Sequence, residues 1–146
     1  MTAFTKALAA GAAGASVTTL LHELTRRLTP DAPRVDLLGM QALARVLRGA
    51  GVDPPGHGAL YNLTLAGDLV SNTGYFGLVG AAPRDRAAAV GVALGVTAGL
   101  GAVLLPRPLG LSTRPTERTV RTAALTVALY TAGGIAAGVS YGMAPD

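Results

Sequence analysis

One acidic residue, Asp68, lies near the middle of an apolar stretch, residues 58–82, that contains no other charged residue. If this stretch crosses a membrane, an unpaired charge there costs roughly 2.5 kcal/mol or more, and ionisable residues kept at such depth usually serve transport or binding. A carboxylate in that position could bind and release a proton or hold a cation. Asp68 is therefore the residue that points most directly to chemistry.

Other polar side chains share the side of the helix on which Asp68 would lie. They precede or follow Asp68 at steps of three or four residues, the spacing that stacks side chains along one side of a helix: Tyr61, Thr64, Ser71, Asn72 and Tyr75. Because a polar side cannot favourably face lipid, we expect it to face the bundle interior or a wet cavity. Tyr130, in a later apolar segment, is a possible facing partner.

His22 and Glu23 end the first apolar segment of the chain. We expect Asn62 to lie at a similar depth, and Asp68 to lie about 9 Å deeper at 1.5 Å of helix rise per residue. A graded row of these four residues could pass a proton or hold a cation, since histidine titrates near neutral pH.

Plainer explanations of the same residues remain open. A lone aspartate in a membrane bundle can simply hydrogen-bond across helices and fix their registry. His22 and Glu23 can mark a membrane boundary, with Glu23 pairing Arg26 or Arg27 one helical turn later. A metal site would need these residues together with His57, and the sequence shows no recognisable ligand spacing. We therefore predict no metal and no cofactor, and the absence of a Ser-His-acid spacing favours a protein that is not an enzyme.

The composition indicates a small membrane protein. Of the 146 residues, 50% are hydrophobic and 14% are charged, against about 25% charged in soluble domains. The absence of cysteine excludes disulfides, thiol catalysis and cysteine-based metal sites. The formal charge of +4 could suggest nucleic acid, but the arginines fall between apolar segments, which indicates membrane topology rather than a nucleic-acid partner.

Apolar segments long enough to cross a hydrocarbon core of about 30 Å recur along the chain. We place these spans at residues 4–25, 58–82, 87–105 and 120–143, within a single membrane domain of residues 1–146. A further helix over residues 34–48 carries apolar residues on one side and arginines on the other, which is typical of a helix lying flat on a membrane surface. A signal peptide in place of the first span and a soluble Ala-rich bundle are the alternatives.

The basic residues predict which side each loop faces. The segments between spans one and two and between spans three and four carry nine basic residues, and the opposite side carries three. The positive-inside rule therefore puts both loops in the cytoplasm and both termini outside it. The predicted fold class is all-α: an integral membrane four-helix bundle with an additional amphipathic helix on the cytoplasmic side, in the inner membrane of a bacterium.

Small residues recur at every fourth position in the third and fourth spans, which lets helices approach closely: Gly91, Gly95, Gly99, Gly134 and Gly138. These stripes predict packing within the chain, a homo-oligomer, or assembly into a larger membrane complex. On the surface helix, we expect Arg34, Arg45 and Arg48 to meet lipid phosphates. The alternative is a helix that caps the bundle without contacting particular head groups.

Three functional classes follow from these patterns. The sequence favours an accessory or structural subunit that packs with itself or with a larger membrane complex. The first alternative is a proton-linked transporter or ion channel that uses Asp68. The second is a lipid-binding or lipid-modifying protein that uses His22 and Glu23. Membrane lipids are expected partners in every case, and nucleic acid is not.

Overall fold

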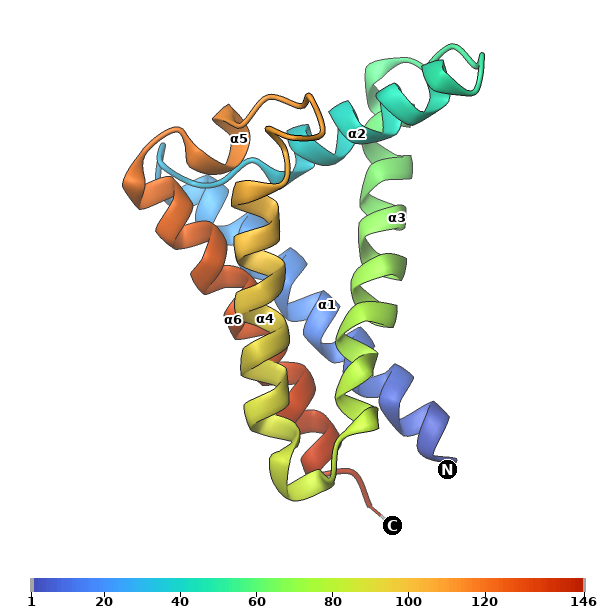
Figure 1. The fold of residues 1–146 in the computed structure, drawn as a ribbon, viewed down its shortest axis with the longest axis vertical. Coiled ribbons are helices and arrows are strands. Elements are labelled where there is room, and N and C mark those ends of the chain that lie inside the picture. The colour runs from blue at the N-terminus through green and yellow to red at the C-terminus, as the bar shows by residue number, and fades with distance from the viewer. Residues whose placement is uncertain (1, 146) are drawn as a thin grey trace.

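The computed structural model describes residues 2–145, and all regular secondary structure within them is helical. The long helices run between two ends of the molecule (Figure 1): α1 (Ala3–Leu28), α3 (His57–Gly77), α4 (Ala87–Leu104) and α6 (Val120–Gly142). The shorter elements cap or connect them: α2 (Val35–Gly49), α5 (Arg114–Glu117) and the 3-10 turns η1 (Leu78–Ala81) and η2 (Arg84–Arg86). The predicted all-α class is confirmed, and the helix bounds lie close to those expected from the sequence.

Three helical segments are long and apolar enough to cross a membrane: Ala3–Leu28, Arg84–Leu104 and Val120–Gly142. They correspond to the first, third and fourth predicted spans and suggest a membrane location. The second predicted span, residues 58–82, is not among these three segments. Helix α3 forms there but ends at Gly77 and continues as the 3-10 turn η1, and its polar residues keep it out of the set defined by length and apolarity.

Local sequence explains where several helices begin and end. α1 and α6 start after threonine caps, because the Thr2 hydroxyl accepts the Thr5 amide at 3.2 Å and the Thr119 hydroxyl accepts the Thr122 amide at 3.0 Å. Just after α2, Gly51 has a φ of +74°, a left-handed conformation that glycine adopts without steric cost. These signals were present in the sequence at each boundary.

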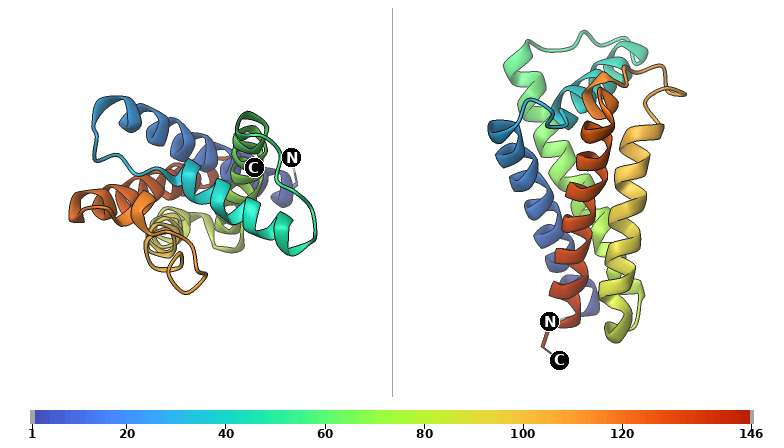
Figure 2. Two further views of the ribbon diagram at one scale, coloured as in Figure 1. Left: turned by 90° about the horizontal axis from the view of Figure 1, so that it is seen from above. Right: turned by 90° about the vertical axis from the view of Figure 1, so that its left-hand side faces the viewer.

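Both termini lie at one end of the molecule, which we call the terminal end (Figure 2). At the other end, the α2 end, α2 crosses over the long helices beside α5 (Figure 1). The two arginine-rich connections therefore share one end, as the charge pattern predicted. Which side of a membrane this end faces stays a prediction.

The glycine stripes bring α4 and α6 into backbone contact along their length. A Cβ added at Gly95 would lie 2.6 Å from the Tyr130 carbonyl oxygen, and one at Gly99 would lie 2.5 Å from the Val127 Cα. Gly91 faces Gly134 and Gly138 in the same way. All five predicted packing glycines are thus used in one intramolecular interface: Gly91, Gly95, Gly99, Gly134 and Gly138.

Polar contacts hold the connections together at the α2 end. The Arg34 amide donates to the Pro115 carbonyl at 2.7 Å, which joins the start of α2 to α5. Arg121 Nη1 lies 3.4 Å from Asp31 Oδ2, which ties the start of α6 to the segment after α1. These contacts fix α2 across the end of the bundle and thereby position the walls of the cavities described next.

Candidate functional site

A cavity of about 270 Å³ lies between α1 and α3 near the α2 end. The two helices are in contact where Gly11 meets the Thr73 carbonyl, and they diverge from there toward the α2 end (Figure 1). We call the space between them the α1–α3 cavity. Polar side chains from three helices line it: His22 from α1, Tyr61, Thr64, Asp68 and Asn72 from α3, and Tyr130 from α6.

The Asp68 carboxylate lines this cavity without a protein partner. The residue is partly buried, yet within residues 2–145 its carboxylate makes no hydrogen bond or ion pair. The Ser71 hydroxyl donates to the Asp68 backbone carbonyl at 3.2 Å and leaves the side chain free. An aspartate that fixed helix registry would have a cross-helix partner, since buried polar groups are almost always hydrogen-bonded.

His22, which also lines this cavity, carries a second unpartnered group. Its Nδ1 lies 2.9 Å from the Thr18 carbonyl oxygen, which can only accept, so the contact assigns the proton of the neutral ring to Nδ1. Nε2 is then an acceptor, and it is buried with no partner among residues 2–145. The ring packs edge-on against Tyr130, with centroids 5.3 Å apart.

The Thr64 hydroxyl is the third such group. It is buried and makes no hydrogen bond in the described part of the chain. Leaving a buried polar atom unpaired costs about 1–3 kcal/mol. The carboxylate of Asp68, the imidazole of His22 and this hydroxyl therefore form a set that favours water, a proton or a small polar ligand in the cavity.

Glu23 lines the cavity, but its carboxylate is already bound. Arg27 Nε donates to Glu23 Oε1 at 3.0 Å, and Arg26 binds the other carboxylate oxygen. The alternative in which Glu23 pairs with arginines one turn later is thus confirmed. Asn62 is exposed and does not line the cavity, so the row expected from His22 through Asn62 to Asp68 is not formed.

The first turn of α2 contributes an acidic residue that the sequence interpretation missed. Asp36 lines the cavity, and Arg34 Nη2 lies 2.7 Å from its Oδ2. Burial of Asp36 raises its pKa, but the hydrogen bonds and charge of Arg34 outweigh that effect and leave the pKa below its ordinary value. The position of Asp36 in a first helical turn, where acids are favoured, was the available signal.

A second cavity also reaches Asp68. It measures about 210 Å³ and lies between α3 and the end of α4, beneath α2. Asp68 and Tyr130 line this α3–α4 cavity as well as the first one. The carboxylate therefore stands between two spaces rather than at the end of one.

Within residues 2–145, no group of three or more His, Cys, Asp or Glu side chains could hold a metal ion. The α1–α3 cavity instead offers the Asp68 carboxylate, hydroxyls, an amide and an imidazole nitrogen, which bind protons, small cations and water, while its other charged residues, Glu23, Arg26, Arg27 and Asp36, form ion pairs. Comparison of the chain with protein-family models, curated proteins and solved structures finds no match, so its function must be inferred from this geometry.

Proposed function

We propose that the chain is a small multi-span membrane protein that binds and releases a proton or a small cation at Asp68. The observation that supports this most strongly is the partner-free carboxylate beside the α1–α3 cavity. A charge removed from water without a partner is so costly that the group is expected to take up a proton or hold a cation. Either event would make Asp68 an exchange site rather than a packing residue.

The proposal includes α3 as a fourth membrane span. Its exposed side carries large apolar residues that suit lipid contact: Leu63, Leu65, Leu69 and Val70. Most of its polar side chains turn toward the bundle, with Asn62 and Ser71 as exposed exceptions. A helix with this arrangement can cross a bilayer despite its low mean hydropathy, because the polar residues face an interior cavity.

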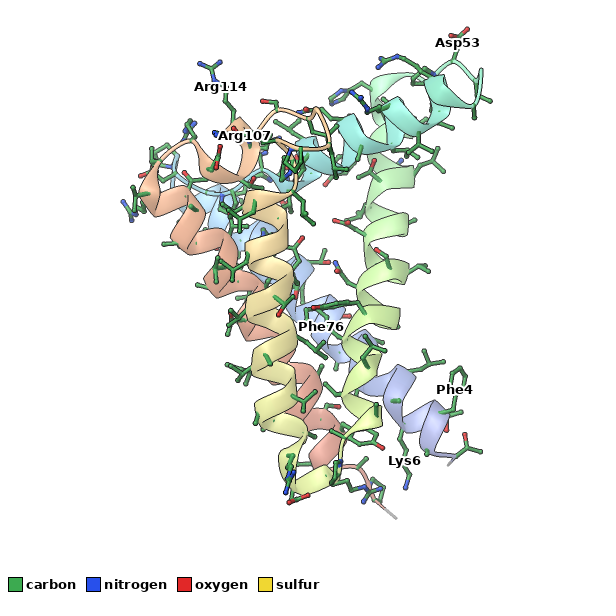
Figure 3. All side chains as sticks on the ribbon, viewed as in Figure 1. Phe4, Lys6, Asp53, Phe76, Arg107 and Arg114 are labelled. Atoms are coloured by element: carbon green, nitrogen blue, oxygen red, sulfur yellow. The ribbon has the colours of Figure 1, made fainter. Side chains whose placement is uncertain are left out.

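The surroundings of Asp68 support exchange toward the α2 end. In that direction the cavity is lined by His22, whose buried Nε2 has no partner among residues 2–145. In the other direction Phe76 and Val79 are fully buried, and Figure 3 shows the Phe76 ring turned into the bundle. In this conformation Asp68 would therefore exchange with the α2 side, and flux across the membrane would require a second conformation that opens Asp68 toward the terminal end.

The test is flux through liposomes that contain the purified protein and a pH-sensitive dye. Under an imposed pH gradient, wild type should acidify or alkalise the lumen, and folded Asp68→Asn should not. Asn62→Ala is the matched control, because it alters a polar residue on the exposed side of the same helix and should keep the flux. A sodium or potassium gradient at clamped pH separates a cation from a proton. Equal flux in wild type and Asp68→Asn would contradict the proposal.

The accessory-subunit interpretation stays a prediction, but one of its supports has weakened. It drew on small-residue stripes that a partner helix could use, and α4 and α6 use those stripes on each other. The lipid-modifying alternative needs Glu23 as a free group, whereas Arg26 and Arg27 occupy its carboxylate. Proton or cation exchange at Asp68 is therefore the better supported of the three classes.

A further inference from the structure

A cleft of about 480 Å³ lies at the α2 end, between α2, the start of α3 and the loop after α4. We propose that this cleft binds an anionic membrane lipid, with its phosphate held by Arg45 and Arg48 and an acyl chain along the apolar wall. We call it the Arg45–Arg48 cleft. The proposal shares the membrane location with the proposed function but does not depend on Asp68.

The positive charge at this cleft is not neutralised by the protein. Arg45 is exposed, and its Nη1 reaches only the Gly110 carbonyl oxygen, at 3.4 Å. Arg48 is exposed and makes no hydrogen bond or ion pair within residues 2–145. Most other arginines at this end have acidic partners: Arg26 and Arg27 on Glu23, Arg34 on Asp36, Arg107 on Glu117, and Arg118 and Arg121 on Asp31. Two guanidinium groups that lack an acidic partner and lie one helical turn apart suit a phosphate, which arginine binds with paired hydrogen bonds.

Ion pairing with acidic residues removes one arginine from the set expected to bind lipid head groups. Arg34 points its guanidinium at Asp36, with Nη2 to Oδ2 at 2.7 Å, so its charge is already matched. His57, at the start of α3, lines the cleft together with Arg45 and Arg48. The cationic rim is therefore formed by the end of α2 rather than by the whole arginine side of α2.

The wall of the cleft distinguishes a lipid from a free phosphate. It is built from apolar side chains of α2, α3 and the loop after α4: Leu37 and Leu111 are partly exposed, and Met40, Ala44 and Leu60 are buried behind them. Leu111 also lines the α3–α4 cavity together with Leu105, which is exposed just after α4. A free phosphate would gain nothing from such a wall, whereas a lipid acyl chain would bury apolar surface against it.

The test uses the purified full-length chain in detergent, with retained lipid measured by native mass spectrometry during titration with phosphatidylglycerol or phosphatidylcholine. Wild type should bind phosphatidylglycerol more tightly than phosphatidylcholine. Arg45→Gln and Arg48→Gln should each weaken phosphatidylglycerol binding by roughly fivefold, the effect of one basic residue at a lipid surface. Arg114→Gln is the matched control, since Arg114 is also unpaired at this end but points away from the bundle (Figure 3).

Several results would overturn the assignment. Equal binding of the two lipids would remove the phosphate contact, and an equal loss in Arg114→Gln would show a general charge effect. Inorganic phosphate that displaces the lipid at comparable concentration would make the cleft a free-anion site. Circular dichroism should show unchanged helix content in each variant, because both arginines are exposed. Proton flux should also be unchanged in the arginine variants, which separates this inference from the role of Asp68.

Discussion

Helices α6 and α3 both carry a buried threonine, but its hydroxyl is hydrogen-bonded on α6 and has no partner on α3. On α6, the Thr126 hydroxyl donates to the Thr122 carbonyl at 2.9 Å, and the Thr131 hydroxyl donates to the Val127 carbonyl at 2.7 Å. On α3, the Thr64 hydroxyl has no partner among the described residues, and neither has the carboxylate of Asp68. One helix satisfies its polar groups internally, and the other leaves them facing a cavity.

The packing of the two helices explains the difference. α6 touches α4 along its length through glycine contacts that leave no space for a ligand. α3 is anchored at its second half, where Phe76 is fully buried, while its first half stands apart from α1 and α4 (Figure 1). A protein selected for stability alone would close this space or replace its polar groups, so the open half of α3 marks the region kept for function.

The largest expected effect tests the anchoring of α3. Phe76→Ala should lower the free energy of unfolding by about 3–5 kcal/mol, because it removes a fully buried aromatic ring from the core. Leu65→Ala, on the open half of the same helix and 41% exposed, should lose far less. Thermal unfolding of the two variants in the same detergent makes the comparison. Equal losses would mean that both halves of α3 are packed alike.

A smaller effect on the free energy of unfolding distinguishes a hydroxyl that is hydrogen-bonded from one that has no partner. Thr126→Val removes a hydrogen-bonded hydroxyl and should destabilise the protein by about 1 kcal/mol, the net worth of such a bond. Thr64→Val removes a hydroxyl that has no partner, so it should be neutral or stabilising while lowering proton flux. Chemical unfolding and liposome flux measured on both variants test the contrast, and a destabilised Thr64→Val would indicate a protein partner for that hydroxyl.

The smallest expected effect concerns pH. The pKa of Asp36 is lower in the folded protein than in the unfolded chain. Its pairing with Arg34 therefore stabilises the protein fully at pH values above the ordinary aspartate pKa of about 4. That contribution should be lost as pH falls through the lowered folded-state pKa. Wild type should therefore lose more stability in acid than Asp36→Asn. Melting curves collected from pH 6 downward would show the two converging, and parallel curves would rule the contribution out.

Much of this fold could be predicted from the sequence, because apolar length and glycine spacing act locally. The bounds of α1, α4 and α6 follow from runs of apolar residues between charged ends, and glycine every fourth residue predicts close helix packing without identifying the partner helix. The membrane status of α3 was less predictable. Its polar side is tolerable only where other helices shelter it, and that depends on their positions rather than on α3 itself.

The sequence predicted which α3 residues line the site, but not which of the side chains have hydrogen-bond or ion-pair partners. Thr64, Asp68 and Asn72 share a side because they are four residues apart, and all three line the α1–α3 cavity. Asn62 was expected there from its depth alone, although six residues turn a helix by about 600°, which puts it roughly 120° away from Asp68. That Glu23 is bound while Asp68 is free depends on side-chain partners, which spacing does not determine.

The most direct test of the central claim is the protonation of Asp68 itself in a lipid bilayer. Infrared difference spectra of wild type minus Asp68→Asn, recorded through a reversible pH cycle, isolate this one carboxyl group. Exchange at Asp68 predicts a protonated carboxyl band that appears and disappears with pH, shifts in D₂O because the carboxyl proton is replaced by deuterium, and is missing in the variant. Identical spectra for the two proteins at every pH would contradict the account, because they would mean that Asp68 neither binds nor releases a proton.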